Sequence, residues 1–126
     1  MAMFYTLDAN KRAIPCRSAH EWGVWFATAD RVVARDTVGE VVVSTVFLGI
    51  DHNFHGQGDP LLFETMVFLA DGEPGRLRRY FIWGEAEQGH REIMQAIQVE
   101  SEMASVSVAD VITSMMQRFN VPAGAG

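Results

Sequence analysis

Cysteine is nearly absent from this sequence, which has one, Cys16, among 126 residues. A single thiol cannot close an internal disulfide, and the opening stretch MAMFYTLDAN lacks the charged and then apolar pattern of a secretion leader. Long apolar runs are missing too, because the longest candidate, EVVVSTVFLGI, is strand-like and well short of the roughly 18 residues that span a bilayer. We therefore expect a cytoplasmic protein that does not insert into the membrane.

Positive charge is also scarce. Lys and Arg total 10 against 16 Asp and Glu, which gives a net charge of −6 and a pI near 5.1. Nucleic-acid affinity rests on clustered Lys and Arg, so we do not expect DNA or RNA as a partner. The acidic residues are spread along the sequence rather than run together, which is typical of a solvated surface.

The length and the composition indicate one folded domain. A chain of 126 residues with 48% apolar residues can bury one core but is too short for two independent ones. The ending NVPAGAG contains Pro122 and glycines, which cannot continue a helix. We therefore expect a single domain over residues 1–120 and a C-terminal tail over residues 121–126.

Three stretches have helical patterning. In SAHEWGVWFATAD, Ser18 and Glu21 have capping-box spacing, and an aromatic stripe follows that we expect to pack against a sheet. In EAEQGHREIMQAI, one stripe holds His90 among apolar residues, and this helix should cover the sheet. The strongest pattern is SVADVITSMMQRF, over residues 107–119, where Ser107 and Asp110 form another capping box.

The remaining patterns indicate strands. MFYTLDANKRAIPC predicts a small hairpin that turns at residues 8–11, and the β-branched runs on either side of DTVG predict a second hairpin. LLFETMVFLA and RRYFIW are typical of further strands, separated by the turn residues DGEPG. Together they predict an α+β fold: a mostly antiparallel twisted sheet of about five strands with two or three helices packed on it.

Several of these stretches resemble a known group of sequences. STVFLGIDHNF, PLLFETMVF and RYFIWGEAEQGH, with EWGVWFATADRVVA ahead of them, are similar to a family of small uncharacterised proteins encoded by phages and bacterial prophage regions. The resemblance covers residues 4–95 and ends before Ser101. The family has no settled activity, so the resemblance implies a phage-associated setting and assigns no catalytic residue.

The stretch FLGIDHNFHGQGDPLLFETM holds the densest group of chemically reactive side chains. The candidates for metal binding or acid–base chemistry are four residues of this stretch, Asp51, His52, His55 and Glu64, together with His90. A His-x-x-His pair in a glycine-containing loop lacks the one-face geometry that a helix provides, so we expect no metal and no cofactor. The alternative is a loop that closes a hairpin, in which Asp51 and Asp59 cap turns, Gly56 and Gly58 take positive φ, and the histidines are solvated.

Two further stretches of the sequence carry charge near apolar residues. Glu64 alternates with apolar neighbours on either face of its strand, so it is either buried with a partner, for which His90 and the nearby arginines are candidates, or exposed at a sheet edge. The arginines of RLRR, Arg76, Arg78 and Arg79, could bind an anion through their guanidinium groups, or they could form a solvated strand end.

The C-terminal helix has an apolar stripe that must be buried somewhere. It could pack on its own sheet or on the same helix of a second copy. We favour a homodimer because two helices already cover the sheet and methionines suit adaptable interfaces. The expected interface residues are Val108, Val111, Ile112, Met115 and Phe119.

The function expected from the sequence is binding rather than catalysis. No nucleophile elbow, phosphate loop or dinucleotide fingerprint is present. With the family setting, this favours a non-enzymatic phage accessory protein that binds a host protein, such as a defence component, or a small ligand. Two alternatives stay open: a phage particle or assembly component, and a small metal-dependent or acid–base enzyme.

Overall fold

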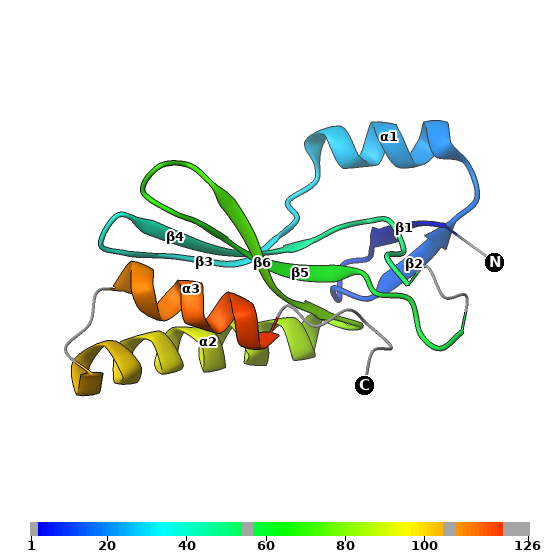
Figure 1. The fold of residues 1–126 in the computed structure, drawn as a ribbon. Coiled ribbons are helices and arrows are strands. Elements are labelled where there is room, and N and C mark those ends of the chain that lie inside the picture. Colours follow the sequence, from blue (N-terminus) through cyan, green and yellow to red (C-terminus); the bar gives the residue numbers. More distant parts are fainter. Residues whose placement is uncertain (1–2, 54–56, 105–107, 120–126) are drawn as a thin grey trace.

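The computed structural model describes residues 3–53, 57–104 and 108–119 of the chain (Figure 1). In order, the elements are β1 (Phe4–Leu7), β2 (Ala13–Cys16), α1 (Ala19–Thr28), β3 (Val32–Val38), β4 (Val41–Phe47), β5 (Phe63–Phe68), β6 (Pro74–Tyr80), α2 (Trp83–Ala104) and α3 (Val108–Phe119). The expected α+β class is confirmed. The strands form a two-stranded sheet, β1-β2, and a four-stranded antiparallel sheet, β3-β4-β5-β6, where we expected one sheet of about five strands.

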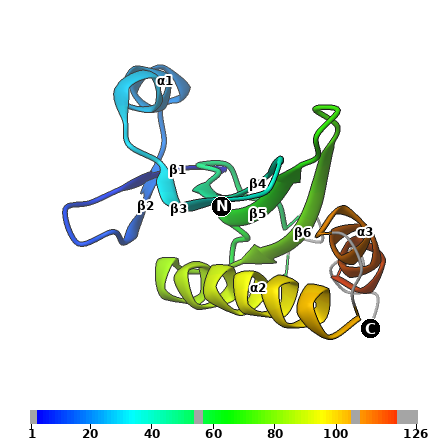
Figure 2. The ribbon, with the colours of Figure 1, turned by 90° about the vertical axis from the view of Figure 1, so that its left-hand side faces the viewer.

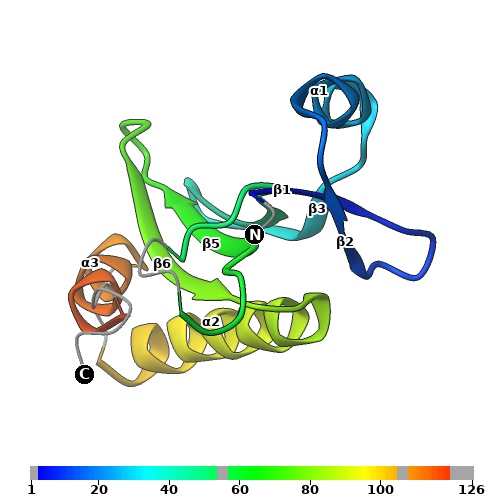
Figure 3. The same cartoon turned by 90° about the vertical axis from the view of Figure 1, so that its right-hand side faces the viewer.

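The helices divide between two sides of the larger sheet. Figures 2 and 3 show α2 beneath the sheet and α3 beside β6 next to α2, while α1 lies on the opposite side beside the β1-β2 hairpin. None of the helices within the described ranges is long and apolar enough to cross a membrane.

Alternation along β4 explains which face the helices cover. Val41 and Val43 pack in one cluster with α2 and α3, Thr45 contacts His90 of α2, and Phe47 packs in a second cluster with Ala86 of α2 and with Trp25 of α1; all four strand residues are at most 3% exposed. Side chains of a strand alternate between faces, so Val42 and Val46 point the other way and are only half buried. The face toward α2 and α3 therefore holds the core, and the other face is more exposed, although Ser44 and Glu64 on it are buried.

The stripe of α3 belongs to that core. Val111, Ile112 and Met115 are at most 3% exposed and pack in one cluster with Ile93 and Ile97 of α2 and with β4, β5 and β6. The expected dimer interface is wrong for these three residues, because the sheet of their own chain buries them. The side chains of Val108 and Phe119, which we also assigned to that interface, lie outside the described residues.

The aromatic stripe of α1 packs mainly on the N-terminal hairpin. The Ser18 side chain caps the helix by accepting from the Glu21 backbone N–H at 3.2 Å, as the capping box predicted. The Trp22 indole N–H donates to the Tyr5 carbonyl at 3.0 Å. Gly49 lies against this indole with φ of 76°, and a Cβ there would be 3.0 Å from the ring nitrogen, so the position requires glycine.

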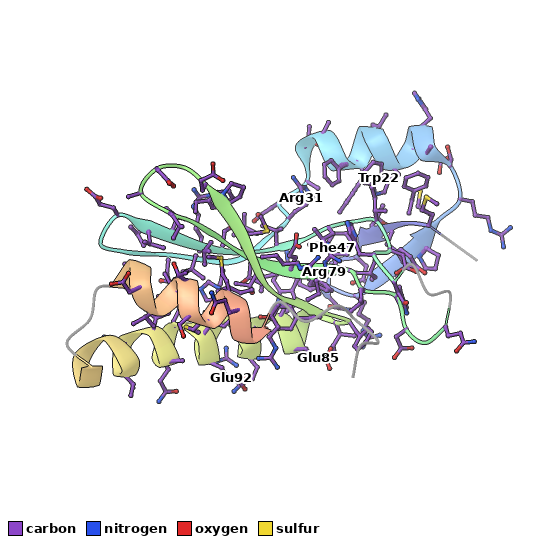
Figure 4. The ribbon with its side chains drawn as sticks, viewed as in Figure 1. Trp22, Arg31, Phe47, Arg79, Glu85 and Glu92 are labelled. Carbon is purple, nitrogen blue, oxygen red and sulfur yellow. The ribbon has the colours of Figure 1, made fainter. Side chains whose placement is uncertain are left out.

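Arg31 and Trp25 connect this hairpin unit to the larger sheet. The Arg31 guanidinium lies 3.8 Å from the ring centre of Phe26 and donates to the Phe47 carbonyl at 3.2 Å (Figure 4). The Trp25 ring meets the Phe47 ring edge to face at 5.9 Å. The stacking of the Arg31 guanidinium on the Phe26 ring therefore holds α1 beside β4. The helix α1 does not cover the sheet face on its own side.

One turn assignment differs from the sequence prediction. The first hairpin forms as expected, with Asp8 accepting from two backbone N–H groups and Lys11 taking a positive φ of 64°. The second hairpin turns at residues 39–40, so Asp36 is inside β3 rather than in a turn. This difference matters, because strand pairing brings Asp36 opposite Val43, on the face that α2 covers.

Candidate functional site

Five polar side chains form a continuous line of hydrogen bonds across the covered face of the sheet. His90 Nε2 lies 2.7 Å from Asp36 Oδ2, and His90 Nδ1 lies 2.7 Å from Thr45 Oγ1. Thr45 Oγ1 is 2.6 Å from Thr65 Oγ1, which is 2.8 Å from the Tyr80 hydroxyl. We call this set, Asp36, His90, Thr45, Thr65 and Tyr80, the buried polar network.

Burial is uneven along the buried polar network. Thr45 and Thr65 are fully buried, and His90 and Tyr80 are each 3% exposed. The Asp36 side chain, in contrast, is 54% exposed on the edge strand β3. The line of hydrogen bonds therefore reaches solvent at Asp36 and runs inward beneath α2, where a substrate would not contact the threonines.

Strand register places the members of the network. Thr45 and Thr65 are directly paired residues of β4 and β5, so their short side chains meet on the same face. His90 projects from α2 on the stripe that also holds Ala86, Ile93 and Ile97, as the sequence predicted, and all four are buried. Each polar atom has a partner, which is the condition for burying such groups at low cost in free energy.

Tyr80 ends the network at β6. Burial raises the pKa of its phenol above the ordinary value of 10.0, an effect that the hydrogen bond with Thr65 and the charge of Arg78 oppose. The hydroxyl is therefore neutral near pH 7. Gly89 of α2 leaves room for the ring, because a Cβ at that position would lie within 2.5 Å of the Tyr80 hydroxyl oxygen.

Tyr80 and Gly89 also line a cleft between the end of β6 and the first turns of α2. The β6–α2 cleft has a volume of about 530 Å³, and its lining residues lie in the ranges 78–82 and 84–92. Phe81 and Ile82 stand at its rim with 40% and 60% of their surfaces exposed. Exposed large apolar side chains beside a hollow are typical of a binding surface.

A side chain in the first turn of α2 fixes the backbone at the entrance of the cleft. Glu85 Oε1 accepts from the backbone N–H groups of Phe81 at 3.1 Å and Ile82 at 3.4 Å. An acidic side chain in the first turn satisfies N–H groups that have no partner within the helix. Figure 4 shows Glu85 and Glu92 along the same helix, below the sheet.

The charges beside the cleft are balanced by ion pairs. Arg78 donates to Glu92 at 2.9 Å, and this hydrogen bond, with a second from Gln88, lowers the pKa of the Glu92 carboxyl. Arg79 pairs with Glu64 at 3.3 Å. Among the charged side chains that line the β6–α2 cleft, Arg78, Arg79 and Glu92 are therefore held in ion pairs, whereas the Glu85 carboxylate accepts from backbone N–H groups.

The three arginines predicted as one anion site do not share a face. A β-bulge in β6 places Leu77 and Arg78 together opposite Thr65, on the covered face, where Arg78 reaches α2. Arg79 lies opposite Glu64 and Arg76 opposite Met66, both on the other face of the sheet. The prediction of one anion-binding cluster is therefore wrong.

The other predicted candidates are also distributed. Asp51 accepts from the backbone N–H groups of Asn53 at 2.8 Å and Leu61 at 3.0 Å, so it caps the loop as expected, and Gly58 has the expected positive φ. His52 Nδ1 lies 2.8 Å from the Ile50 carbonyl oxygen. His55 and Gly56 lie outside the described residues. Across the described ranges, no three His, Cys, Asp or Glu side chains converge in a way that could hold a metal ion.

Glu64 is buried with a partner, which is one of the two arrangements that its sequence pattern left open. It is 9% exposed, and its partner is Arg79, whereas His90 lies on the opposite face with Asp36.

We expect Glu64→Ala to lower the free energy of unfolding by about 1 kcal/mol, because the Arg79 guanidinium loses its acceptor at a partly solvated site. Urea denaturation measures this, with Glu64→Gln as the control, since an amide oxygen still accepts. An unchanged midpoint in Glu64→Ala would show that the pair does not stabilise the fold.

Comparisons with protein-family models, curated proteins and solved structures give no match to this chain.

Proposed function

We propose that this protein is a non-enzymatic accessory protein that binds an apolar, uncharged segment of a partner protein in the β6–α2 cleft. The observation that supports this most is the exposure of Phe81 and Ile82, at 40% and 60%, beside a hollow of about 530 Å³. Apolar side chains that enter such a hollow would cover this surface and exclude water from it.

The chemistry of the walls specifies the kind of segment. Arg78 and Arg79 are neutralised by Glu92 and Glu64, so an uncharged segment leaves both ion pairs intact. A charged segment would compete with one of these ion pairs, and its own charged groups would lose their solvation shell on binding. We therefore propose a segment with apolar side chains rather than an acidic or basic one.

The edge of the sheet supports an extended conformation of that segment. Among the described strands, β6 is the last in the sheet, and the Leu62 N–H donates to the Tyr80 carbonyl at 3.1 Å, so Tyr80 faces β5. Backbone groups alternate in direction along a strand, so those of Arg79 and Phe81 point away from β5. The Phe81 N–H donates to Glu85. The outward groups of Arg79 are placed to pair with an extended backbone.

The resemblance to phage-encoded proteins gives the proposed setting. We propose that the protein acts in the cytoplasm of a bacterial host and that its partner is a host protein. A phage structural protein as the partner would instead support a role in particle assembly. No surface is proposed for a homodimer, since Val111, Ile112 and Met115, three of the residues first assigned to it, lie in the core.

Ile82→Arg should abolish partner binding, because a guanidinium at the rim would have to be desolvated when the segment enters. The test captures partners from host lysate with tagged wild-type protein, Ile82→Arg and Val24→Arg. Val24 is 63% exposed on α1, on the other side of the sheet, so its variant controls for added surface charge. Recovery of the same proteins with wild type and Val24→Arg, and their loss with Ile82→Arg, is expected.

Equal recovery with all three proteins would contradict the proposed site. Circular dichroism of both variants checks that the fold is retained, as expected for substitutions of exposed residues.

A further inference from the structure

The buried polar network has two self-consistent directions of hydrogen bonding. A carboxylate accepts and cannot donate, so His90 Nε2 donates to Asp36 in either case. When His90 is neutral, Nδ1 is an acceptor, so Thr45 donates to His90, Thr65 donates to Thr45 and Tyr80 donates to Thr65. Each hydroxyl proton then has an acceptor inside the network.

A second proton on His90 reverses this order. Nδ1 becomes a donor to Thr45, so Thr45 donates to Thr65 and Thr65 donates to the Tyr80 oxygen. The Tyr80 hydroxyl proton then has no acceptor in the network and must turn away from Thr65. Because Gly89 packs directly against this hydroxyl and lines the cleft with Tyr80, the proton turns at the wall of the cleft.

We propose that the buried polar network transmits the protonation state of His90 to Tyr80 and so makes the β6–α2 cleft responsive to pH. This regulation of the cleft rests on the binding function proposed above. The proton enters at the Asp36 end, where the side chain is 54% exposed, and its effect appears at the other edge strand. Hydrogen bonds in such a line reverse together, because each hydroxyl donates one proton only.

Few charged or titratable side chains face His90 in the part of the chain that the structure describes. On the covered face, β3 contributes Asp36, while the inward residues of β4 and β5 are apolar or threonine. β6 contributes Tyr80 and Arg78, and Arg78 is already paired with Glu92 of α2. The described inward residues of α3 are Val111, Ile112 and Met115, none of which titrates.

Nuclear magnetic resonance tests the proposal on the full-length protein without any partner. We expect the Tyr80 ¹³Cζ signal and the backbone amide of Gly89 to shift with pH at the same midpoint as the His90 ring signals. In Thr45→Val, which cuts the line between His90 and Thr65, the Tyr80 signal should no longer follow the His90 ring signals. Thr65→Val provides the same cut if the first variant does not fold.

The ring signals of His20 are the internal control, because His20 is exposed on α1 on the other side of the sheet and the Tyr80 signal should not follow them. A Tyr80 signal that does not move with His90 in the wild-type protein would overturn the proposal. So would a Tyr80 signal that follows His90 equally in the Thr45→Val protein. Because this test requires no ligand, its failure would be distinct from a failure to find a partner for the cleft.

Discussion

Ile112→Asp should leave the protein unfolded. Ile112 is fully buried between α2 and the sheet, so the substitution removes a large apolar side chain and places a carboxylate among aliphatic neighbours. Loss of the side chain costs about 2–5 kcal/mol, and a buried unpaired charge adds several more. Small domains have only about 5–15 kcal/mol of stability in total, so the sum is comparable with the whole stability of the fold.

Far-ultraviolet circular dichroism and urea denaturation measure this effect. Ser114→Asp is the matched control, because Ser114 is exposed on the same helix and should tolerate the charge. A folded Ile112→Asp protein that changes only from dimer to monomer would contradict the core position of α3 and support the interface first expected from its sequence.

Gly89→Ala should destabilise the protein by about 1–3 kcal/mol or more, because the added methyl group overlaps the Tyr80 ring. The Cβ would lie within 2.5 Å of both the ring carbon that bears the hydroxyl and the hydroxyl oxygen. Either α2 moves away from the sheet or the ring leaves its position, and each displaces part of the buried polar network.

Gly84→Ala gives the comparison within the same helix. Nothing lies within 4 Å of a Cβ at Gly84, so alanine there should be neutral or stabilising by up to about 1 kcal/mol through helix propensity. Thermal unfolding of the two variants separates a steric effect from a propensity effect. Equal or higher stability in Gly89→Ala would mean that Tyr80 does not pack against α2 as described.

The helices were the part of the fold that the sequence predicted best. The stripe of Ala86, His90, Ile93 and Ile97 and the capping residue Ser18 are local patterns with helical spacing, and each corresponds to an observed helix. Such patterns show that a face is apolar but not what covers it. For that reason the α3 stripe was predicted correctly as a helix face, while Val111, Ile112 and Met115 were assigned wrongly to a second copy.

The buried polar network could not be predicted because its contacts are distant in sequence. Thr45 and Thr65 are separated by 20 residues, and Asp36 and His90 by 54. Strand register decides which side chains meet, and a shift of one residue would move a side chain to the other face. Asp-Thr-Val-Gly was also assigned to a turn, which removed Asp36 from the candidates.

The cleft could not be predicted from the sequence either, because it depends on where β6 ends and α2 begins. Phe81 and Ile82 belong to a run that predicts a strand, and their exposure arises only because β6 ends at Tyr80 and α2 begins at Trp83. For Glu64, the sequence pattern left two environments open, a buried ion pair or an exposed position at a sheet edge. Pairing of β5 with β6 selects Arg79 as its partner.

Photo-crosslinking from position 82 tests the proposed binding site most directly. A benzophenone amino acid replaces Ile82 in one protein and Val24 in a control, and both are irradiated in host lysate. We expect a covalent adduct from position 82 alone, attached to an apolar, uncharged peptide of one partner protein. No adduct from position 82, or the same adduct from both positions, would contradict binding in the β6–α2 cleft.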